Sequence, residues 1–348
     1  MMAGGPLNSG RRPTMKDVAR HAGVSLSTVS YVLNDSGPVA ESRRARVLDA
    51  LRVLNYEPNE AARHLKKRSS PNIGLVVPEL SNQFFALLVE GVEQVVSNND
   101  GLVVLCAPEA TSDGKSTNGR LLRSQRLSGI VYLSGSRMLS SALVELTRQG
   151  PVVLVDEYVP GFDDLPAIVS DNRRGGRQIA QYVTGAGHRD VAIIAGPESL
   201  WTTQQRIAGY REALASAGID PDAVPVHWGD YRQQSGFDLA KLVLSVPVDE
   251  RPTAILCAND LMAVGVLEYC RSVGISVPAD LSVVGFDDIP FVSLLTPRLT
   301  TVRQLARDMG RLAASLLFEL MADKGPVQSP TPLPVEIMVR ESVAPPSR

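Results

Sequence analysis

Short hydroxyl side chains gather at the start of a helix predicted over Leu26–Leu33, where they could contact nucleic-acid phosphates. Ser25 is placed to cap this helix, and Val29, Val32 and Leu33 are predicted to face inward. The outward face then carries Leu26, Ser27, Ser30 and Tyr31. A helix of this size fits the major groove of DNA. The alternative is a small helical hairpin within an unrelated helical domain.

A second predicted helix precedes this one, and a glycine joins the two. Thr14 and Asp17 have the spacing of a capping box, in which the hydroxyl and the carboxylate each satisfy a free backbone amide. Gly23 can adopt the left-handed turn that side chains with a Cβ atom disfavour. The inward face of this helix is predicted to hold Val18, Ala19 and Ala22. The spacing therefore predicts a helix-turn-helix.

Charge is distributed unevenly along the 348 residues, although the net charge is only −2. Residues 1–68 carry twelve Lys and Arg against six Asp and Glu, and the remaining residues carry 23 against 31. A basic head on an acidic body indicates that only the head meets a polyanion.

A third helix is predicted near Glu41–Asn55, with a buried stripe of Val47, Leu48, Leu51 and Leu54. Ala40 stands where a hydroxyl cap is usual. Pro58 ends this region, because the residue before a proline is pushed out of the helical conformation. Asn59 could cap one more helix, up to Lys66, that is too short to be stable by itself.

The remainder alternates short apolar runs with amphipathic segments, which is typical of parallel strands covered on both faces by helices. The predicted strands are Ile73–Val77, Leu102–Cys106, Gly129–Leu133, Val152–Val155, Val191–Ala195, Val224–His227, Ala254–Cys257 and Ser282–Phe286. The predicted helices include Phe85–Ser97, Arg173–Thr184, Arg206–Ala217, Gly236–Leu244 and Met262–Val273. About 270 residues suit two doubly wound α/β lobes better than one. The predicted organisation is a disordered arm (1–13), a helix-turn-helix domain (14–58), a hinge helix and linker (59–71) and a two-lobed body (72–348).

Several classes of site and compartment are disfavoured. No predicted strand ends in Gly-x-Gly-x-x-Gly, and no Walker lysine is present, so we expect no nucleotide cofactor. Cys106, Cys257 and Cys270 lack the spacing of a metal site or a disulfide framework, so we expect no metal. The N-terminus lacks the apolar region of a secretory signal, and no apolar run is long enough to span a membrane. We therefore expect a cytoplasmic protein.

The motifs VARHAGVSLSTVSYVLN, RVLDALRVLNYEPNEAARHLKK, IGLVVPELSNQFF, VSDNRRGG, GHRDVAIIAGP, RIAGYREAL, ILCANDLMAVGVL and SVVGFDDIP occur in one order along the chain. From about Thr14 to Arg340 the sequence resembles the LacI/GalR family of transcription regulators. The resemblance implies a helix-turn-helix head, a hinge helix and a body like type I periplasmic sugar-binding proteins. It also implies a homodimer that binds a pseudo-palindromic operator and responds to a small effector, such as a sugar, between the lobes.

The resemblance also implies roles for residues of the head. Ser25 and Thr28 match positions near phosphates, whereas Leu26, Ser27 and Tyr31 match positions that read base edges. Tyr31 departs from the family, in which this position is often basic. Leu65 matches the leucine that wedges into the minor groove. The candidate DNA-binding residues are Thr14, Ser25, Leu26, Ser27, Thr28, Ser30, Tyr31, Asn34, Arg43, Asn59, Ala62, Arg63 and Leu65.

The candidate effector residues lie at the ends of predicted strands and the starts of predicted helices, where ligands of α/β sheets bind. They are Phe84, Phe85, Asp156, Arg206, Tyr231, Asn259 and Asp287. The two phenylalanines match an aromatic pair that could stack on a sugar ring, and ordinary core packing is the alternative. Leu200 stands where purine-binding members carry arginine, and Ala306 replaces an aromatic of the lactose-responsive member. The first departure disfavours a purine carboxylate or phosphate, and the second leaves open which sugar binds.

Two other functions compete with gene regulation. A glycoside hydrolase needs a pair of carboxyl groups at a defined separation, but Asp287 and Asp288 are neighbours whose side chains should diverge. A transport receptor would have a similar body but no basic head. The tail, with Pro345 and Pro346, cannot form the leucine-repeat helix of a tetramer, so we expect a dimer.

Overall fold

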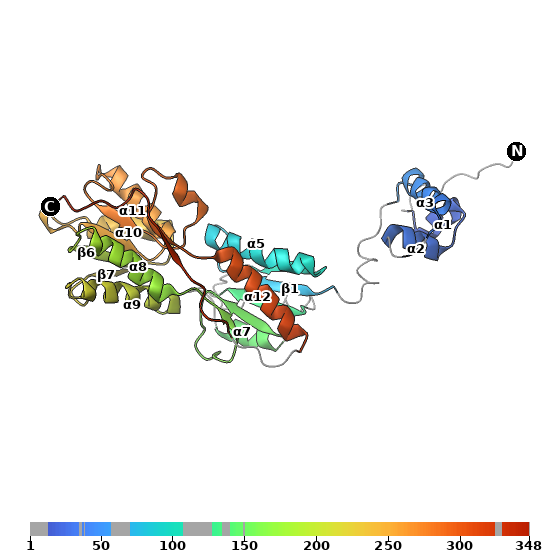
Figure 1. Cartoon of the computed structure of the whole chain (residues 1–348), viewed down its shortest axis with the longest axis horizontal. Coiled ribbons are helices and arrows are strands. Elements are labelled where there is room, and N and C mark those ends of the chain that lie inside the picture. The colour runs from blue at the N-terminus through green and yellow to red at the C-terminus, as the bar shows by residue number, and fades with distance from the viewer. Residues whose placement is uncertain are drawn as a thin grey trace. The chain divides into compact units, whose positions relative to one another are not determined.

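The computed structural model describes residues 13–34, 37, 39–56, 70–106, 127–133, 140–148, 150–323 and 329–347. The chain divides into two compact units, Met1–Ser69 and Ser70–Arg348, which we call the head and the body (Figure 1). Four candidate DNA-binding residues lie outside the described residues, namely Asn59, Ala62, Arg63 and Leu65.

Three helices form the described part of the head: α1 (Met15–Ala22), α2 (Leu26–Asn34) and α3 (Glu41–Val53). The Asp17 carboxylate accepts hydrogen bonds from the amide (2.9 Å) and the hydroxyl (2.6 Å) of Thr14, as a capping box requires. Gly23 has a φ of 61° and ends α1. The Thr28 amide donates to Ser25 Oγ at 3.2 Å, so Ser25 caps α2. The predicted helix-turn-helix is confirmed.

One part of the prediction for α3 is wrong. Leu48 is 50% exposed, whereas Val47 and Ala50 are fully buried. Successive helical residues are about 100° apart, so Leu48 lies beside the stripe that begins at Val47 and continues at Ala50. The helix also ends at Val53, two residues before the predicted end.

A five-stranded parallel sheet, in the order β2-β1-β3-β4-β5, forms the first lobe of the body. Its strands are β1 (Asn72–Val76), β2 (Leu102–Cys106), β3 (Gly129–Leu133), β4 (Val152–Val155) and β5 (Ala167–Ile168). The strands β3 and β4 are buried throughout. The prediction that helices cover both faces of every strand is wrong for β2, since Leu102 and Leu105 are exposed. This strand lies at the edge of the sheet and has a neighbour on one side only.

A four-stranded parallel sheet, in the order β7-β6-β8-β9, forms the second lobe. Its strands are β6 (Val191–Ala195), β7 (Val226–Trp228), β8 (Ala254–Cys257) and β9 (Ser282–Val284). Its helices are α8 (Asn172–Gly185), α9 (Trp201–Ser216), α10 (Gln233–Val243) and α11 (Asp260–Ser272). β7 starts two residues later than predicted, after Pro225, which has no amide hydrogen to donate to a ladder. The doubly wound two-lobed body is confirmed.

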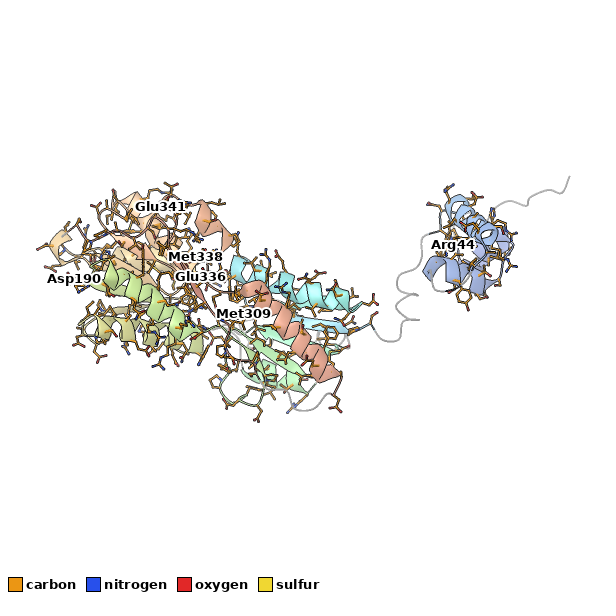
Figure 2. The ribbon with its side chains drawn as sticks, viewed as in Figure 1. Arg44, Asp190, Met309, Glu336, Met338 and Glu341 are labelled. Atoms are coloured by element: carbon orange, nitrogen blue, oxygen red, sulfur yellow. The ribbon has the colours of Figure 1, made fainter. Side chains whose placement is uncertain are left out.

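Helix α12 (Ala306–Met321) belongs to the first lobe although it follows the strands of the second (Figure 1). Its buried side chains, among them Met309, face α5 (Gln83–Asn98) and the sheet (Figure 2). The short antiparallel strands β10 (Thr301–Arg303) and β11 (Glu336–Met338) lie before and after α12 and contact α8. The chain therefore passes between the lobes three times. The elements β5, α7 (Ser140–Thr147), β10, α12 and β11 are not among those predicted.

Three helix pairs of the body cross so closely that glycines lie at the contact. The pairs are α5 with α12 at Gly91 and Gly310, α8 with α9 at Gly176 and Gly209, and α10 with α11 at Gly236 and Gly265. A Cβ atom on Gly176 would lie 2.4 Å from the carbonyl oxygen of Arg206, and one on Gly209 would lie 2.1 Å from that of Arg173. Each helix backbone thus packs directly against its partner, which fixes the position of Arg206 on α9.

Candidate functional site

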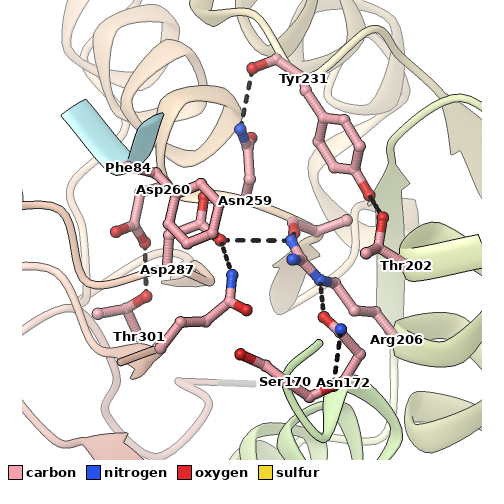
Figure 3. A network of polar contacts seen from close by, with 12 residues as sticks. Phe84, Ser170, Asn172, Thr202, Arg206, Tyr231, Asn259, Asp260, Asp287 and Thr301 are labelled. Atoms are coloured by element: carbon pink, nitrogen blue, oxygen red, sulfur yellow. Dashed lines mark hydrogen bonds and ion pairs between the residues drawn. The ribbon is translucent and has the colours of Figure 1, made fainter. Parts of the chain in front are cut away.

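Buried polar side chains from both lobes meet at the carboxyl ends of the strands, and we call this group the polar cluster. Figure 3 shows the part of it around Arg206, Tyr231, Asn259 and Asp287. Asp156 directly follows β4 of the first lobe, whereas Tyr231, Asn259 and Asp287 follow β7, β8 and β9 of the second. The polar cluster comprises Asp156, Glu157, Asn172, Thr202, Thr203, Arg206, Tyr231, Asn259, Asp287 and Gln304. It therefore includes five of the seven candidate effector residues.

Arg206, on α9, lies at the centre of the polar cluster and is only 3% exposed. Its Nε donates to Asn172 Oδ1 at 2.8 Å, and its Nη1 donates to the carbonyl oxygen of Ala258 at 2.5 Å. Nη1 also lies 3.5 Å from Asp287 Oδ1. The guanidinium carbon stands 4.0 Å from the centre of the Phe286 ring, a cation–π contact. These contacts hold a permanent positive charge in the interior.

The two aspartates beside Arg206 are both buried. Asp287 accepts a hydrogen bond from Gln304 Nε2 at 2.8 Å, and burial raises its pKa to about 7 although Arg206 opposes the shift. Burial also raises the pKa of Asp156, again against the effect of Arg206. Asp156 Oδ1 is buried and has no hydrogen-bond partner. An acceptor left in this state is costly unless a ligand satisfies it.

The backbone at three candidate residues adopts a conformation that favours glycine. The φ angles of Asp156, Tyr231 and Asp287 are 72°, 68° and 113°. For a bulky side chain such as that of Tyr231, this conformation is strained by about 1–3 kcal/mol. Strain of this kind concentrates at sites that hold ligands.

Tyr231 and Asn259 are linked to each other and to the start of α9. The Tyr231 hydroxyl lies 2.7 Å from Thr203 Oγ1, and its backbone carbonyl accepts from Asn259 Nδ2 at 2.9 Å. Asn259 Oδ1 accepts from the amide of Met262 at 2.9 Å and so caps α11. Asn259 thus positions Tyr231, and its direct contact with an effector stays a prediction.

The phenylalanine pair belongs to the first lobe. Phe84 is buried in the core of that lobe, and Phe85 is partly buried against it. Their rings meet edge to face with centres 5.5 Å apart. Phe84 therefore packs in the hydrophobic core, which was the alternative to stacking on a sugar ring. Stacking on a ligand stays a prediction for both rings.

Glu157 is part of the polar cluster but was not predicted. It is only 2% exposed, and its carboxyl group accepts from the amide of Thr202 at 3.2 Å and from the Thr202 hydroxyl. This contact joins the loop after β4 in the first lobe to the first turn of α9 in the second. Next to it, the rings of Tyr158 and Trp201 meet edge to face with centres 4.9 Å apart. Burial, and then the neighbouring Asp156, raise the pKa of Glu157 to about 8.

The raised pKa of Glu157 predicts a pH dependence. The folded protein keeps a proton that the unfolded chain releases above its ordinary pKa of 4.5, so Glu157 costs no stability below that pH. The cost then grows as the pH rises towards about 8. Glu157→Gln mimics the protonated form, so we expect it to flatten this decline and to melt several degrees higher at the alkaline end, because one pKa unit is about 1.4 kcal/mol. Melting curves across this range test it, and a variant with the wild-type slope would contradict it.

The exposed face of α2 is the candidate nucleic-acid interface. Leu26 and Tyr31 are 44% and 46% exposed, and Ser27 is also exposed. Thr28 and Ser30 are half-buried, and Asn34 is the last residue of the helix. The backbone of Gly37 packs against the Tyr31 ring, since a Cβ there would lie 3.1 Å from Cδ1.

Thr14 and Arg43 lie on other elements of the head. Thr14 is the N-cap of α1, and Arg43 is exposed in the first turn of α3. Ala40 is the N-cap of α3 and forms no side-chain hydrogen bond there, because its methyl group cannot accept one. The predicted outward face of α2 is confirmed at Leu26, Ser27 and Tyr31, whereas Ser30, also predicted to face outward, is half-buried. The contact of each residue with DNA stays a prediction.

The described part of the chain shows neither a metal-ligand cluster nor a membrane-spanning helix. No group of three or more His, Cys, Asp or Glu side chains there could hold a metal ion. No helix among the described residues is both long enough and apolar enough to cross a membrane.

Comparison with known families gives two matches. Residues 14–59 match the bacterial regulatory proteins of the lacI family, and residues 180–343 match a periplasmic binding protein-like domain. The chain is 36% identical over 307 residues to the ribose operon repressor of Escherichia coli K12, covering 88% of this chain and 92% of the relative. It is 33% identical over 337 residues to the transcriptional repressor PurR of Vibrio campbellii, covering 95% and 98%.

Solved structures give the same result. The lac repressor dimer bound to operator and the anti-inducer ONPF superposes with a TM-score of 0.79 at 29% identity, covering 96% of this chain and all of the other. A complex of the regulator CelR with cellobiose gives 0.71 at 31% identity, covering 95% and 100%. A LacI family regulator from Enterococcus faecium with bound ribose gives 0.70 at 25%, covering 79% and 99%. With a helix-turn-helix head, a two-lobed body and relatives matched along nearly their whole length, this chain belongs to the LacI family of DNA-binding transcriptional regulators.

Proposed function

We propose that this protein is a cytoplasmic repressor that binds a pseudo-palindromic operator as a homodimer, and that a sugar bound at the polar cluster changes its operator affinity. The observation that carries the effector part is the buried set of Asp156, Arg206 and Asp287, drawn from both lobes. Carboxylates and a guanidinium offer acceptors and donors at fixed spacing, which suits vicinal hydroxyl groups.

Two further observations support a sugar. The relatives include a repressor named for the ribose operon and regulators solved with ribose and cellobiose. Leu200, at the N-terminus of α9, stands where purine-binding members carry arginine, so no charged donor is present there for a purine.

The carboxyl groups support a binding role over a hydrolytic one. Asp287 is paired with Arg206 and Gln304, whereas Asp288 accepts from Arg303 Nε at 2.8 Å and from Arg340 Nη2 at 2.5 Å. The two side chains diverge, so they do not flank a common bond as the acid and base of a glycosidase must. Through these contacts Asp288 links Arg303 on β10 and Arg340 in the C-terminal segment to the loop after β9.

We expect the head to carry the DNA affinity. Twelve basic residues within residues 1–68 predict that operator binding weakens steeply with salt, by about 10³-fold between about 50 and 200 mM if six phosphates are contacted. A protein that begins at Ser70 should keep a cooperative melting transition and lose operator binding. Gel-shift titrations of both proteins on operator and random DNA measure this, and a body that still binds operator at physiological salt would refute the assignment.

A sugar effector should stabilise the body and change operator affinity together. A ligand at a hundred times its dissociation constant stabilises the state that binds it by about 2.7 kcal/mol. Ribose, other pentoses and hexoses, cellobiose and, as a contrast, guanine and hypoxanthine are screened by thermal shift, and each hit is added to an operator titration. A purine that gives the only shift would contradict the sugar assignment.

A further inference from the structure

Carboxyl groups outnumber cationic groups in the polar cluster. Its charged side chains are three carboxyl groups, Asp156, Glu157 and Asp287, and one guanidinium, Arg206. Each of the four is at least 92% buried, so solvent does little to balance them. With all groups ionised, the polar cluster would carry two more negative than positive charges.

Arg206 cannot neutralise the excess, because a single guanidinium offsets only one of the three carboxylates. Its Nε donates to the Asn172 side chain, and Nη1 donates to the carbonyl oxygen of Ala258 and lies near Asp287. Glu157 receives only neutral donors, the amide and hydroxyl of Thr202.

The fully buried atoms of the polar cluster that lack a hydrogen-bond partner are acceptors. Among the described residues, three buried side-chain atoms have no hydrogen-bond partner, and two of them, Asp156 Oδ1 and Gln304 Oε1, belong to this cluster. The side-chain amide nitrogen of Gln304 already donates a hydrogen bond to Asp287 Oδ1. A ligand that completes the polar cluster must therefore bring donors to these two atoms.

An ammonium group meets this requirement better than a hydroxyl group. It has three donors and no acceptor, whereas each hydroxyl brings one donor together with lone pairs that need donors in return. A positive charge would also offset the mutual repulsion of the carboxyl groups, which together with burial raises the pKa of Glu157 to about 8 and that of Asp287 to about 7.

We propose that the effector is an amino sugar or a similar aminated polyol, whose protonated amino group binds at Asp156 and Glu157 while its hydroxyl groups bind Arg206 and Asp287. The proposal rests on the proposed sugar-responsive function and narrows it. In this arrangement Asp156 and Glu157 select the charge of the ligand, and Arg206 selects its hydroxyl groups. Because Glu157 is held by Thr202 of the second lobe, the ammonium group would bind where the two lobes meet.

The test compares matched sugars on the full-length protein, purified free of sugar. The pairs are glucosamine with glucose, galactosamine with galactose and mannosamine with mannose, and the N-acetyl derivatives keep the nitrogen but lose the charge. Calorimetric titrations are run below the pKa of the amine. We expect one aminated sugar to bind at least about tenfold more tightly than its neutral partner and its N-acetyl derivative, because hydrogen bonds between charged groups are stronger than those between neutral groups.

Two variants assign that preference to the carboxyl groups. Asp156→Asn keeps a residue type that tolerates a φ of 72°, and Glu157→Gln keeps the shape of the side chain that contacts Thr202. Each should weaken binding of the aminated sugar more than binding of its neutral partner, so that the tenfold ratio of their affinities falls towards one, and melting curves confirm that each variant folds. A preference that survives in both folded variants would overturn the assignment to these residues.

Two other outcomes of the titrations distinguish the amino-sugar proposal from the sugar-responsive function on which it rests. Neutral sugars that bind as tightly as their aminated partners would overturn the inference and leave the sugar-responsive repressor intact. If no sugar of either kind binds while the operator is still bound, the sugar class itself is overturned, and this inference with it.

Discussion

Arg206→Met should abolish the effector response and destabilise the body by about 3–5 kcal/mol, because it leaves the buried Asp287 without its cationic partner. The same change removes the donors to Asn172 and to the carbonyl oxygen of Ala258. Arg211→Met, an exposed position on the same helix, is the matched control and should change stability by no more than about 0.5 kcal/mol. Urea unfolding and calorimetric titration of both variants measure the two effects.

A double variant distinguishes the role of Arg206 in stability from its role in ligand binding. In Arg206→Met with Asp287→Asn, the carboxylate that forms the ion pair with Arg206 is removed as well, so part of the lost stability should return. Effector binding should stay absent, since the guanidinium is still missing. If the single variant melts like the wild-type protein, Arg206 does not support the lobe as its contacts indicate.

Gly176→Ala is expected to have the second large effect. The added Cβ would lie 2.4 Å from the Arg206 carbonyl oxygen, so α8 and α9 must separate, at a cost of about 1–3 kcal/mol or more. Gly185→Ala is the control on the same helix, because nothing lies within 4 Å of a Cβ at that position. There the better helix propensity of alanine should leave stability unchanged or slightly raised.

Effector affinity provides a second readout of the same pair. Because Gly176 packs on the backbone of Arg206, a displacement of α9 should weaken sugar binding in Gly176→Ala and not in Gly185→Ala. Equal melting temperatures for the two variants would contradict the close crossing of α8 and α9.

Features of the head that depend on neighbouring residues were predictable from the sequence. The contact of Thr14 with Asp17, the turn at Gly23 and the cap at Ser25 each involve residues at most three apart, so spacing and residue type determine them. The error at Leu48 arose from the phase of the helix, which only the packing of α1 and α2 against α3 decides.

Contacts between remote segments were not predictable in the same way. Glu157 and Thr202 lie 45 residues apart and on different lobes, and neither residue stands in a pattern that points to the other. The one available signal was that Glu157 follows Asp156 at the end of a strand. Similarly, the spacing of Met309, Ala313 and Leu317 is that of a helix, but the sequence does not indicate that this helix covers the first sheet.

The position of α12 has a consequence for how the protein is made. During synthesis the residues of the first sheet and α5 leave the ribosome well before α12, because this helix, which packs on Leu88 and Gly91, is translated only after the four strands of the second sheet. At about 5–20 residues per second, that apolar face stays uncovered for some tens of seconds. The head has its own core around Val18, Val29 and Val47 and depends on no later segment. A nascent chain would thus hold a finished DNA-binding head well before it holds a body that can respond to a ligand.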